Sequence, residues 1–278
     1  MRQEADGVFF ETREPVNLTW LQPYGRVFYV FDRLTSGNLC LGVEGAFGRL
    51  FVKYAGARTL NYTGRTQDAV VTLRTAERIY REFPHPALVP LRAAGPVNGG
   101  QGYALFFPWM DMPALRTVPP DGEVLRRVRR LPLTVRLGML EQVFALHAHL
   151  EQNGLTAVGF DDGNVLIDFD GGGAYVCDVD LYRPGPVANP RGRMPGRGAF
   201  RAPEEYVPGA LIDDRTTVYK MAVLALMLLD GGESGWDAPE GLRRVAMRAA
   251  QQERERRYAS VTAFLSAWRE AVREDWLY

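Results

Sequence analysis

The chain has 278 residues, and its 33 lysine and arginine residues are balanced by 33 aspartate and glutamate residues. This balance excludes recruitment of nucleic acid or of an anionic membrane surface by bulk charge. Hydrophobic residues make up 46% of the chain and charged residues 24%, which is typical of a globular protein with one large or two small domains.

Lysine is almost absent from the basic residues, because only Lys53 and Lys220 among the 33 are lysine. A retained lysine is a candidate for a position where the planar guanidinium of arginine could not replace a compact ammonium group. Of the two, Lys53 lies within a pattern that predicts a β-strand.

Three strands are predicted near the start of the chain, over 27–34, 39–43 and 49–54, with a turn at Ser36-Gly37-Asn38. Alternation in the third strand places Lys53 on the same face as Phe51. A helix is predicted over 67–83, with Glu77 on its inward stripe. A strand pair over 88–93 and 103–107 follows, with a glycine turn between its strands.

The pattern becomes helical after Pro108, where prolines 108, 113, 119 and 120 mark a linker. A long helix is predicted over 134–153, and two short strands, 165–167 and 174–177, follow it. The segment 184–198 has no periodicity, contains neither serine nor threonine, and is predicted to be a mobile surface loop. Asp213 or Asp214 is predicted to cap a helix that runs through Leu229, and Ser260 to cap the last helix.

These elements predict an α+β fold with two lobes: an N-terminal lobe of sheet and one helix over 1–108, and a mainly helical C-terminal lobe over 109–278. We expect a cytoplasmic protein, because Cys40 and Cys177 have no disulfide or metal-ligand spacing and the chain begins without the pattern of a signal peptide. No apolar run reaches the ~18 residues of a transmembrane helix, so no membrane segment is expected.

Four residues carry groups suited to phosphate and metal chemistry, and a cleft between two such lobes is a common ligand site. Lys53 and Glu77 make a candidate ion pair that holds the ammonium toward phosphate oxygens. Asn164 and Asp178 flank the predicted hairpin and offer hard oxygen ligands of the kind that Mg²⁺ prefers. Taken singly, Lys53 also fits a solvated lysine on a strand, and Glu77 fits an exposed glutamate on a helix. Asn164 and Asp178 also fit ordinary turn residues.

From about Val27 to Trp268 the sequence resembles the protein-kinase superfamily, and most closely its compact bacterial Ser/Thr-kinase-like members. Phe51-Val52-Lys53 is similar to the V-A-I-K strand, and Glu77 to the glutamate of helix C. Leu146-His147 followed by 159–164 resembles the catalytic-loop region, and Cys177-Asp178-Val179-Asp180 takes the place of D-F-G. Arg201-Ala202-Pro203-Glu204-Glu205 resembles the end of the activation segment.

The resemblance implies a two-lobe kinase fold that binds ATP with Mg²⁺, or with Mn²⁺. It implies that Lys53 holds phosphates, that Glu77 positions Lys53, and that Asn164 and Asp178 bind the metal. It further implies a phosphate-gripping loop at Gly37, a pairing of Arg257 with the glutamate of Ala202-Pro203-Glu204, and an adenine-contacting hinge formed by Phe106, Phe107, Pro108 and Trp109.

Three positions depart from the family pattern. The catalytic base of the loop H-R-D-x-x-x-x-N would stand five residues before Asn164, where the chain has Gly159. The base is therefore absent, replaced by Asp161 or Asp162, or dispensable because positioning and metal dominate phosphoryl transfer. Gly37 is the only glycine of the degenerate glycine-rich loop, and Thr217 replaces the usual aspartate of a later helix.

Three functions follow from these observations. The first is a kinase that transfers the γ-phosphate of ATP to Ser or Thr of a protein substrate. The second is a pseudokinase, a nucleotide-binding or regulatory module with a protein partner, which Gly159 favours. The third is a small-molecule phosphotransferase of related fold, against which Ala202-Pro203-Glu204 speaks, because the resemblance implies that such segments dock peptides.

Overall fold

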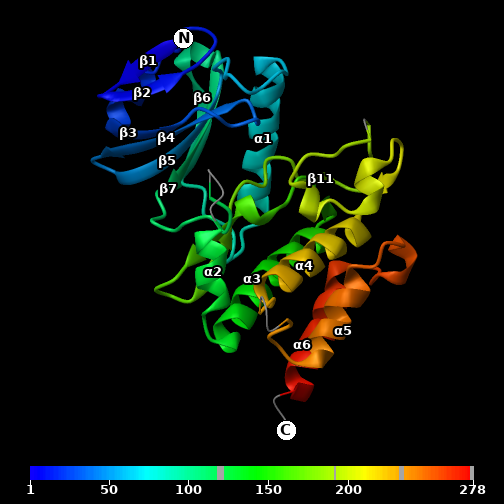
Figure 1. The fold of residues 1–278 in the computed structure, drawn as a ribbon. Helices are drawn as coiled ribbons and strands as arrows, with labels where there is room; N and C mark the ends of the chain where they lie inside the picture. The colour runs from blue at the N-terminus through cyan, green and yellow to red at the C-terminus, as the bar shows by residue number, and fades with distance from the viewer. Residues whose placement is uncertain (118–121, 191, 232–234, 276–278) are drawn as a thin grey trace. The chain divides into compact units, whose positions relative to one another are not determined.

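The computed structural model describes residues 1–117, 122–190, 192–231 and 235–275, and the fold is α+β with small antiparallel sheets (Figure 1). The chain divides into two compact units. The N-unit comprises Met1–Pro84 and Val89–Asp111, and the C-unit comprises His85–Leu88 and Met112–Tyr278. The change from one unit to the other after Asp111 lies close to position 108, where the sequence predicted a boundary.

The N-unit contains a five-stranded antiparallel sheet with the strand order β3-β4-β5-β7-β6. Its strands are β3 (Arg26–Phe31), β4 (Asn38–Gly45), β5 (Gly48–Ala55), β6 (Ala93–Val97) and β7 (Gly102–Pro108). A hairpin of β1 (Arg2–Ala5) and β2 (Val8–Glu11) and the 3-10 helix η1 (Thr19–Tyr24) precede the sheet, and η2 (Asn98–Gly100) connects β6 to β7. The three strands predicted between 27 and 54 are confirmed.

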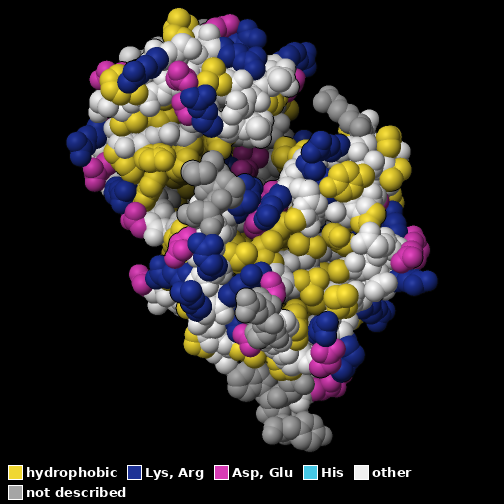
Figure 2. All heavy atoms as spheres, in the orientation of Figure 1, with side chains coloured by type: hydrophobic (Ala, Val, Ile, Leu, Met, Phe, Trp, Pro, Cys, Tyr) yellow, Lys and Arg dark blue, Asp and Glu magenta, His cyan; other side chains and the backbone are white. Residues whose placement is uncertain are grey.

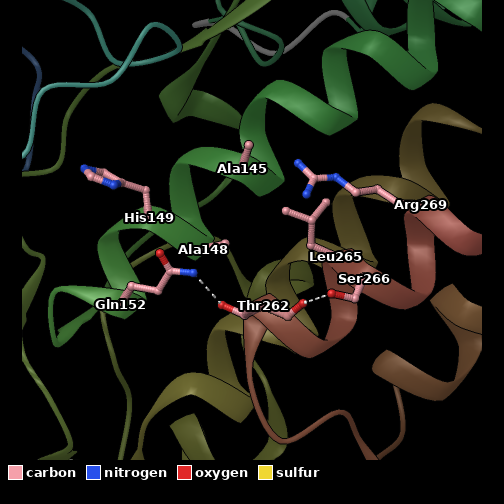
Figure 3. A pocket seen from close by; sticks show the side chains of 8 residues that line it. All are labelled: Ala145, Ala148, His149, Gln152, Thr262, Leu265, Ser266 and Arg269. Atoms are coloured by element: carbon pink, nitrogen blue, oxygen red, sulfur yellow. Dashed lines mark hydrogen bonds between the residues drawn. The ribbon is translucent and has the colours of Figure 1, made fainter.

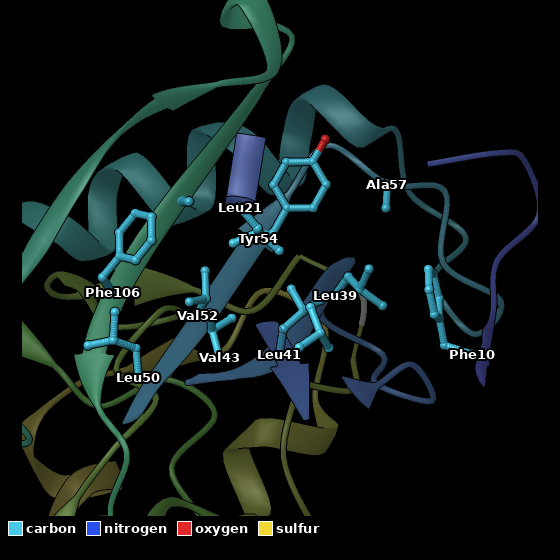
Figure 4. Packing of buried hydrophobic residues seen from close by; sticks show 12 residues of the cluster. Phe10, Leu21, Leu39, Leu41, Val43, Leu50, Val52, Tyr54, Ala57 and Phe106 are labelled. Atoms are coloured by element: carbon cyan, nitrogen blue, oxygen red, sulfur yellow. The ribbon is translucent and has the colours of Figure 1, made fainter. Parts of the chain in front are cut away.

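One face of this sheet carries a hydrophobic core (Figure 4). Leu50, Val52 and Tyr54 of β5 alternate into it, as the period of a strand requires. Burial of each such side chain contributes about 1.5–3 kcal/mol. The opposite face of β5 carries Phe51 and Lys53.

Helix α1 (Thr66–Glu82) contacts β5 and β7 and packs on that opposite face. Tyr80 of α1 packs against Phe107 of β7 with 4.9 Å between ring centroids, and Phe107 is the register partner of Phe51. The helix begins one residue before the predicted range 67–83 and ends one residue before its end. The sheet is thus packed on both faces, by the core on one side and by α1 on the other.

The strand predicted over 88–93 is wrong, because the structure places β6 at Ala93–Val97. Pro90 cannot donate a ladder hydrogen bond, and Leu88 instead bridges Val176 of the C-unit. Pro96 is tolerated in β6 because this strand is at the edge of the sheet.

The C-unit is mainly helical, with α2 (Glu123–Arg129), α3 (Leu133–Gln152), α4 (Asp214–Leu228), α5 (Glu240–Ala249), α6 (Val261–Asp275) and the 3-10 helix η7 (Arg254–Arg256). Helices α3 and α6 pack through the rings of Phe144 and Phe264, with centroids 5.0 Å apart. The predicted caps are confirmed: the carboxylate of Asp213 accepts from the backbone of α4, and the Ser260 hydroxyl accepts from the backbone of α6.

Short ladders and 3-10 turns fill the rest of the C-unit. The hairpin of β9 (Val165–Asp168) and β10 (Gly173–Val176) confirms the two predicted short strands. Strand β8 (Leu155–Thr156) pairs with β11 (Arg183–Pro184), and β12 (Val187–Ala188) pairs with β13 (Leu211–Ile212). The 3-10 turns are η3 (Asp162–Asn164), η4 (Gly198–Phe200) and η5 (Pro203–Tyr206).

Most described residues of the segment 184–198, which exclude position 191, are exposed, in keeping with the predicted surface loop. Its mobility stays a prediction, and two of its residues are anchored in the interior. Asn189 is buried and its side-chain amide donates to the Glu205 carbonyl at 2.9 Å. Met194 is also buried, and its backbone N–H donates to the same carbonyl at 3.0 Å. Buried polar and apolar anchors of this kind are not visible in a sequence without periodicity.

Two buried ion pairs hold η5, the 3-10 turn that contains Glu204 and Glu205. Arg257 binds the Glu204 carboxylate through both terminal nitrogens, at 2.8 and 3.0 Å, in the pairing that the resemblance implied. Burial works to raise the pKa of Glu204, but Arg257 and the Thr216 hydroxyl outweigh it and lower that pKa. Lys220 pairs with Glu205 at 2.9 Å, with both side chains fully buried.

Figure 2 shows acidic and basic side chains interspersed over the visible face of the molecule, in keeping with the zero net charge. Within the described ranges, no helix is both long and apolar enough to cross a membrane.

Candidate functional site

Lys53 lies in the middle strand of the N-unit sheet, with only 6% of its surface exposed. Its register partners are Cys40 on β4 and Leu105 on β7, both buried. A buried ammonium group requires compensating polar groups, because desolvation of a charge is costly. Lys53 is therefore not the solvated strand lysine that a lysine on a strand usually is.

Glu77 on α1 faces the same side of the sheet as Lys53. Its carboxylate accepts a hydrogen bond from the Tyr103 hydroxyl and pairs with Arg81 at 2.7 Å. Tyr103 and Phe107 share one face of β7 with Leu105, the register partner of Lys53, and both contact α1. The structure thus brings Glu77 and Lys53 to one face, while their direct pairing stays a prediction.

The Glu77 carboxyl is held in its charged form. Burial works to raise its pKa, but the hydrogen bond from Tyr103 and the pairing with Arg81 outweigh burial and lower the pKa. A carboxylate that stays charged at neutral pH is what a positioning partner for an ammonium group needs.

Asn164 and Asp178 come together at one end of the β9–β10 hairpin. Val165 pairs with Val176, and the Cys177 N–H donates to the Asn164 carbonyl at 2.8 Å, which extends the register by one pair. Asp178 follows directly, with a φ of +61° that is uncommon for any residue other than glycine. Such backbone outliers concentrate at functional sites.

The donor set at this hairpin end suits a hard cation. The Asn164 side-chain oxygen accepts the Asp161 N–H at 2.8 Å and keeps a second lone pair. No group of three or more His, Cys, Asp or Glu side chains that could hold a metal alone occurs among the residues that the structure describes. Mg²⁺ bound here would therefore take its other ligands from phosphates and water, as is usual for this ion.

Asp161 and Asp162, the candidate replacements for the missing base, are both buried, with 6% and 3% of their surfaces exposed. Arg116 donates to an oxygen of each, at 3.2 Å to Asp161 and 3.0 Å to Asp162. Arg197 donates its backbone N–H to the second oxygen of Asp161 at 2.8 Å, and its guanidinium group binds the second oxygen of Asp162. All four carboxylate oxygens therefore already accept charge-assisted or backbone hydrogen bonds within the protein.

Gly159 adopts a φ of +77°, a conformation that favours glycine. A Cβ atom placed there would lie 2.9 Å from the Leu181 Cδ1 atom. The position that the family reserves for its catalytic aspartate is thus shaped for a residue without a side chain.

Gly37 also has a structural role, since its φ is +82° and a Cβ atom there would lie 2.8 Å from the Tyr62 ring and 2.9 Å from the Ala69 methyl group. The close approach of helix α1 and the conformation both explain this glycine without a phosphate.

The four predicted hinge residues differ in what they expose. The Phe106 ring is in the N-unit core, 4.6 Å from the Tyr24 ring, and the Phe107 ring is buried against α1. Pro108 and Trp109 are half-buried, and the Arg49 guanidinium group lies 5.2 Å from the Trp109 ring centroid. Of the three aromatic rings, that of Trp109 is the one left partly exposed to contact a ligand.

Two cavities of the C-unit are lined by other residues. One, of about 190 Å³, lies between α3 and α6, where Gln152 donates to the Thr262 hydroxyl at 3.3 Å (Figure 3). The other, of about 220 Å³, includes Asp214, whose pKa is raised to about 6 by burial and by the charges of Glu151 and Asp213. Neither cavity includes a predicted site residue.

Arg116 and Arg197 are the site residues that sequence reasoning did not predict. A lone arginine 46 positions from its partner has no local pattern. The adjacent acidic pair Asp161-Asp162 was the available signal, because two neighbouring carboxylates that become buried require cations.

No protein-family model matches the chain, and a search of curated proteins finds no match either. The kinase resemblance therefore rests on the motifs in the sequence and on the geometry described above.

Proposed function

We propose that the chain is a protein-kinase-like protein whose N-unit and C-unit correspond to the two lobes of that fold. It binds ATP with Mg²⁺ and transfers the γ-phosphate to Ser or Thr of a protein substrate. Lys53 holds the phosphates, Glu77 positions Lys53, and Asn164 and Asp178 hold the metal.

The observation that carries the proposal is the buried pair of Arg257 and Glu204. The two residues are 53 positions apart, and nothing in composition or periodicity connects them. Only the resemblance led us to expect the pair, and the contact is bidentate with the Arg257 side chain fully buried. A false resemblance gives no reason for this contact.

Bound Mg²⁺ supplies the charge that neutralises the phosphate oxygens during transfer. The residues fit it, because one amide oxygen and one carboxylate lie at the same hairpin end and a chelating phosphate is needed to complete the shell. The ammonium group of Lys53 acts as a point charge on the phosphates, and its buried strand keeps it in one place.

Transfer is expected to be slow. A general base contributes a factor of about 10²–10⁴ to the rate. Gly159 supplies no base, and the carboxylates of Asp161 and Asp162 are bound by arginines. These same contacts favour the second candidate function, a pseudokinase that binds nucleotide without consuming it.

Lysine scarcity gives a sharp test of nucleotide binding. An acyl phosphate of ATP transfers its acyl group to a lysine amine beside the phosphates, with release of ATP. We expect acylation of Lys53 that excess ATP·Mg²⁺ suppresses, and none at Lys220, the internal control in the same molecule. Equal labelling of the two lysines, or labelling that ATP leaves unchanged, would contradict the assignment.

Labelled ATP then separates the two candidate functions. Phosphate incorporation into a protein substrate that is lost in Lys53→Ala and in Asp178→Ala supports a kinase. Protection of Lys53 by ATP without any incorporation supports the pseudokinase. Equal incorporation in the wild type and both variants refutes the proposed site, and labelling of a small alcohol alone indicates a small-molecule phosphotransferase.

A further inference from the structure

Arg116 makes three contacts with one short turn, which comprises Asp161 and η3. Its guanidinium group donates to one oxygen of Asp162 at 3.0 Å and to one oxygen of Asp161 at 3.2 Å. Its backbone N–H donates to the Asp162 carbonyl at 3.3 Å. Burial opposes the charge of Arg116, but the two aspartates outweigh burial and raise the pKa of its guanidinium group.

The segment that carries Arg116 is fixed against the strand that follows the turn. The Ile167 N–H donates to the Pro113 carbonyl at 2.9 Å, Ala114 bridges Leu166, and the Leu115 N–H donates to the Val165 carbonyl at 2.7 Å. The backbone that precedes Arg116 is therefore fixed by hydrogen bonds to β9, which starts directly after Asn164. The turn is held on one side by its own strand and on the other by Arg116.

Gly163 leaves space for this guanidinium group. A Cβ atom at Gly163 would lie 2.7 Å from the Arg116 Nη2 atom. Its φ lies outside the left-handed region, so the backbone alone does not require glycine here. The absent side chain is explained by the close approach of Arg116.

The turn also orients Asn164. The Asp161 N–H donates to the Asn164 side-chain oxygen, and an Asp161 side-chain oxygen accepts the Gly163 N–H at 2.8 Å. This reciprocal cap ties the Asn164 side chain to the residue whose carboxylate Arg116 holds. Loss of the Arg116 contacts would therefore alter the position of the Asn164 side-chain oxygen, which would bind the metal.

We propose that Arg116 is a positioning residue that, through Asp161 and Asp162, sets the Asn164 side chain for the metal of the bound nucleotide. This inference rests on the proposed function for the role of Asn164. The Arg116 clamp itself can be tested without nucleotide. Partners in the outer shell of a metal site change metal affinity by about 10–100-fold when they are removed.

The test compares Arg116→Gln, Arg116→Lys and Gly163→Ala with Arg193→Gln, an exposed arginine of the same unit that serves as the matched control. Hydrogen exchange of the Gly163 and Asn164 amides, without nucleotide, reports the turn. We expect about tenfold faster exchange in Arg116→Gln, from loss of the charge-assisted contacts. Arg116→Lys should be intermediate, because one ammonium group lacks the two-pronged geometry. Arg193→Gln should not change the exchange.

The second readout is the Mg²⁺ concentration that half-saturates ATP binding. We expect it to rise about tenfold or more in Arg116→Gln and in Gly163→Ala, with unchanged ATP affinity in the absence of Mg²⁺. The double variant should be no worse than either single one, since both remove the same contact.

Unchanged amide exchange in Arg116→Gln overturns the clamp, and faster exchange with an unchanged Mg²⁺ requirement overturns the positioning role. If Arg116→Gln and Gly163→Ala raise the required Mg²⁺ concentration additively, the inference that both remove the same contact is wrong. If the wild type binds no ATP at any Mg²⁺ concentration, the proposed function fails, and with it the metal role. Faster exchange then still supports the clamp.

Discussion

Replacing Gly159 by aspartate restores the residue type that the kinase pattern expects, but the structure predicts a cost. The φ of +77° is unfavourable for a residue with a side chain by about 1–2 kcal/mol. The Cβ atom would also lie 2.9 Å from Leu181 Cδ1. Moving that side chain from its rotamer costs about 1 kcal/mol.

We therefore expect Gly159→Asp to lose about 2–3 kcal/mol of unfolding free energy, which for a chain of this size is a fall in Tm of about 4–12 °C. The matched control is Gly209→Asp, because Gly209 has the same φ of +77° and no atom near its Cβ position. The control should lose only the backbone part, about 1–2 kcal/mol. Thermal unfolding measured by circular dichroism gives both values.

A Gly159→Asp protein as stable as the wild type refutes the strain argument. If both variants lose the same unfolding free energy, the contribution assigned to the contact with Leu181 is wrong. The same samples test catalysis, because a correctly placed carboxylate should raise phosphotransfer about 100-fold or more. The loss of stability follows from the geometry, and the gain in phosphotransfer rests on the proposed function.

Three further predictions concern stability. Burial lowers the pKa of His147 to about 4, so stability should fall by about 3 kcal/mol as the pH drops from 6.5 to 4; denaturant titrations of His147→Gln should lack this slope, and a retained slope contradicts the assignment. Asp214 has a raised pKa, so Asp214→Asn should stabilise the protein at pH 7 by about 1 kcal/mol after allowance for solvent screening, with the gain vanishing below pH 4. A destabilised Asp214→Asn protein at pH 7 contradicts this. Glu204→Gln should cost about 3–5 kcal/mol in urea unfolding because Arg257 stays buried and charged, and a loss below 1 kcal/mol argues against the buried pair.

The parts of the structure that sequence predicted are those with local signals. Alternation along β5 placed Lys53 on the same face as Phe51, and the structure has the core on the other face. The two predicted short strands placed Asn164 and Asp178 on either side of one hairpin. The Arg257–Glu204 contact is long-range, and an ordered set of motifs was needed to predict it.

The parts that were missed depend on tertiary contacts without a local pattern. The start of β6 at Ala93 depends on its place at the sheet edge, and the anchoring of 184–198 depends on buried partners of Asn189 and Met194. The clamp by Arg116 depends on the register of its segment with β9. Glu77 was correctly placed on an inward-facing stripe, but its partners Tyr103 and Arg81 were not predicted.

The burial of both lysines has a consequence for the turnover of this protein in a cell. Enzymes that attach a protein tag through an isopeptide bond need an accessible lysine amine. In the folded chain Lys53 is inside a sheet and Lys220 inside the helical unit, with 6% and 1% of their surfaces exposed. Attachment of a tag to either lysine therefore requires local unfolding of β5 or α4. A tagged chain would be one that has lost structure in one of these elements.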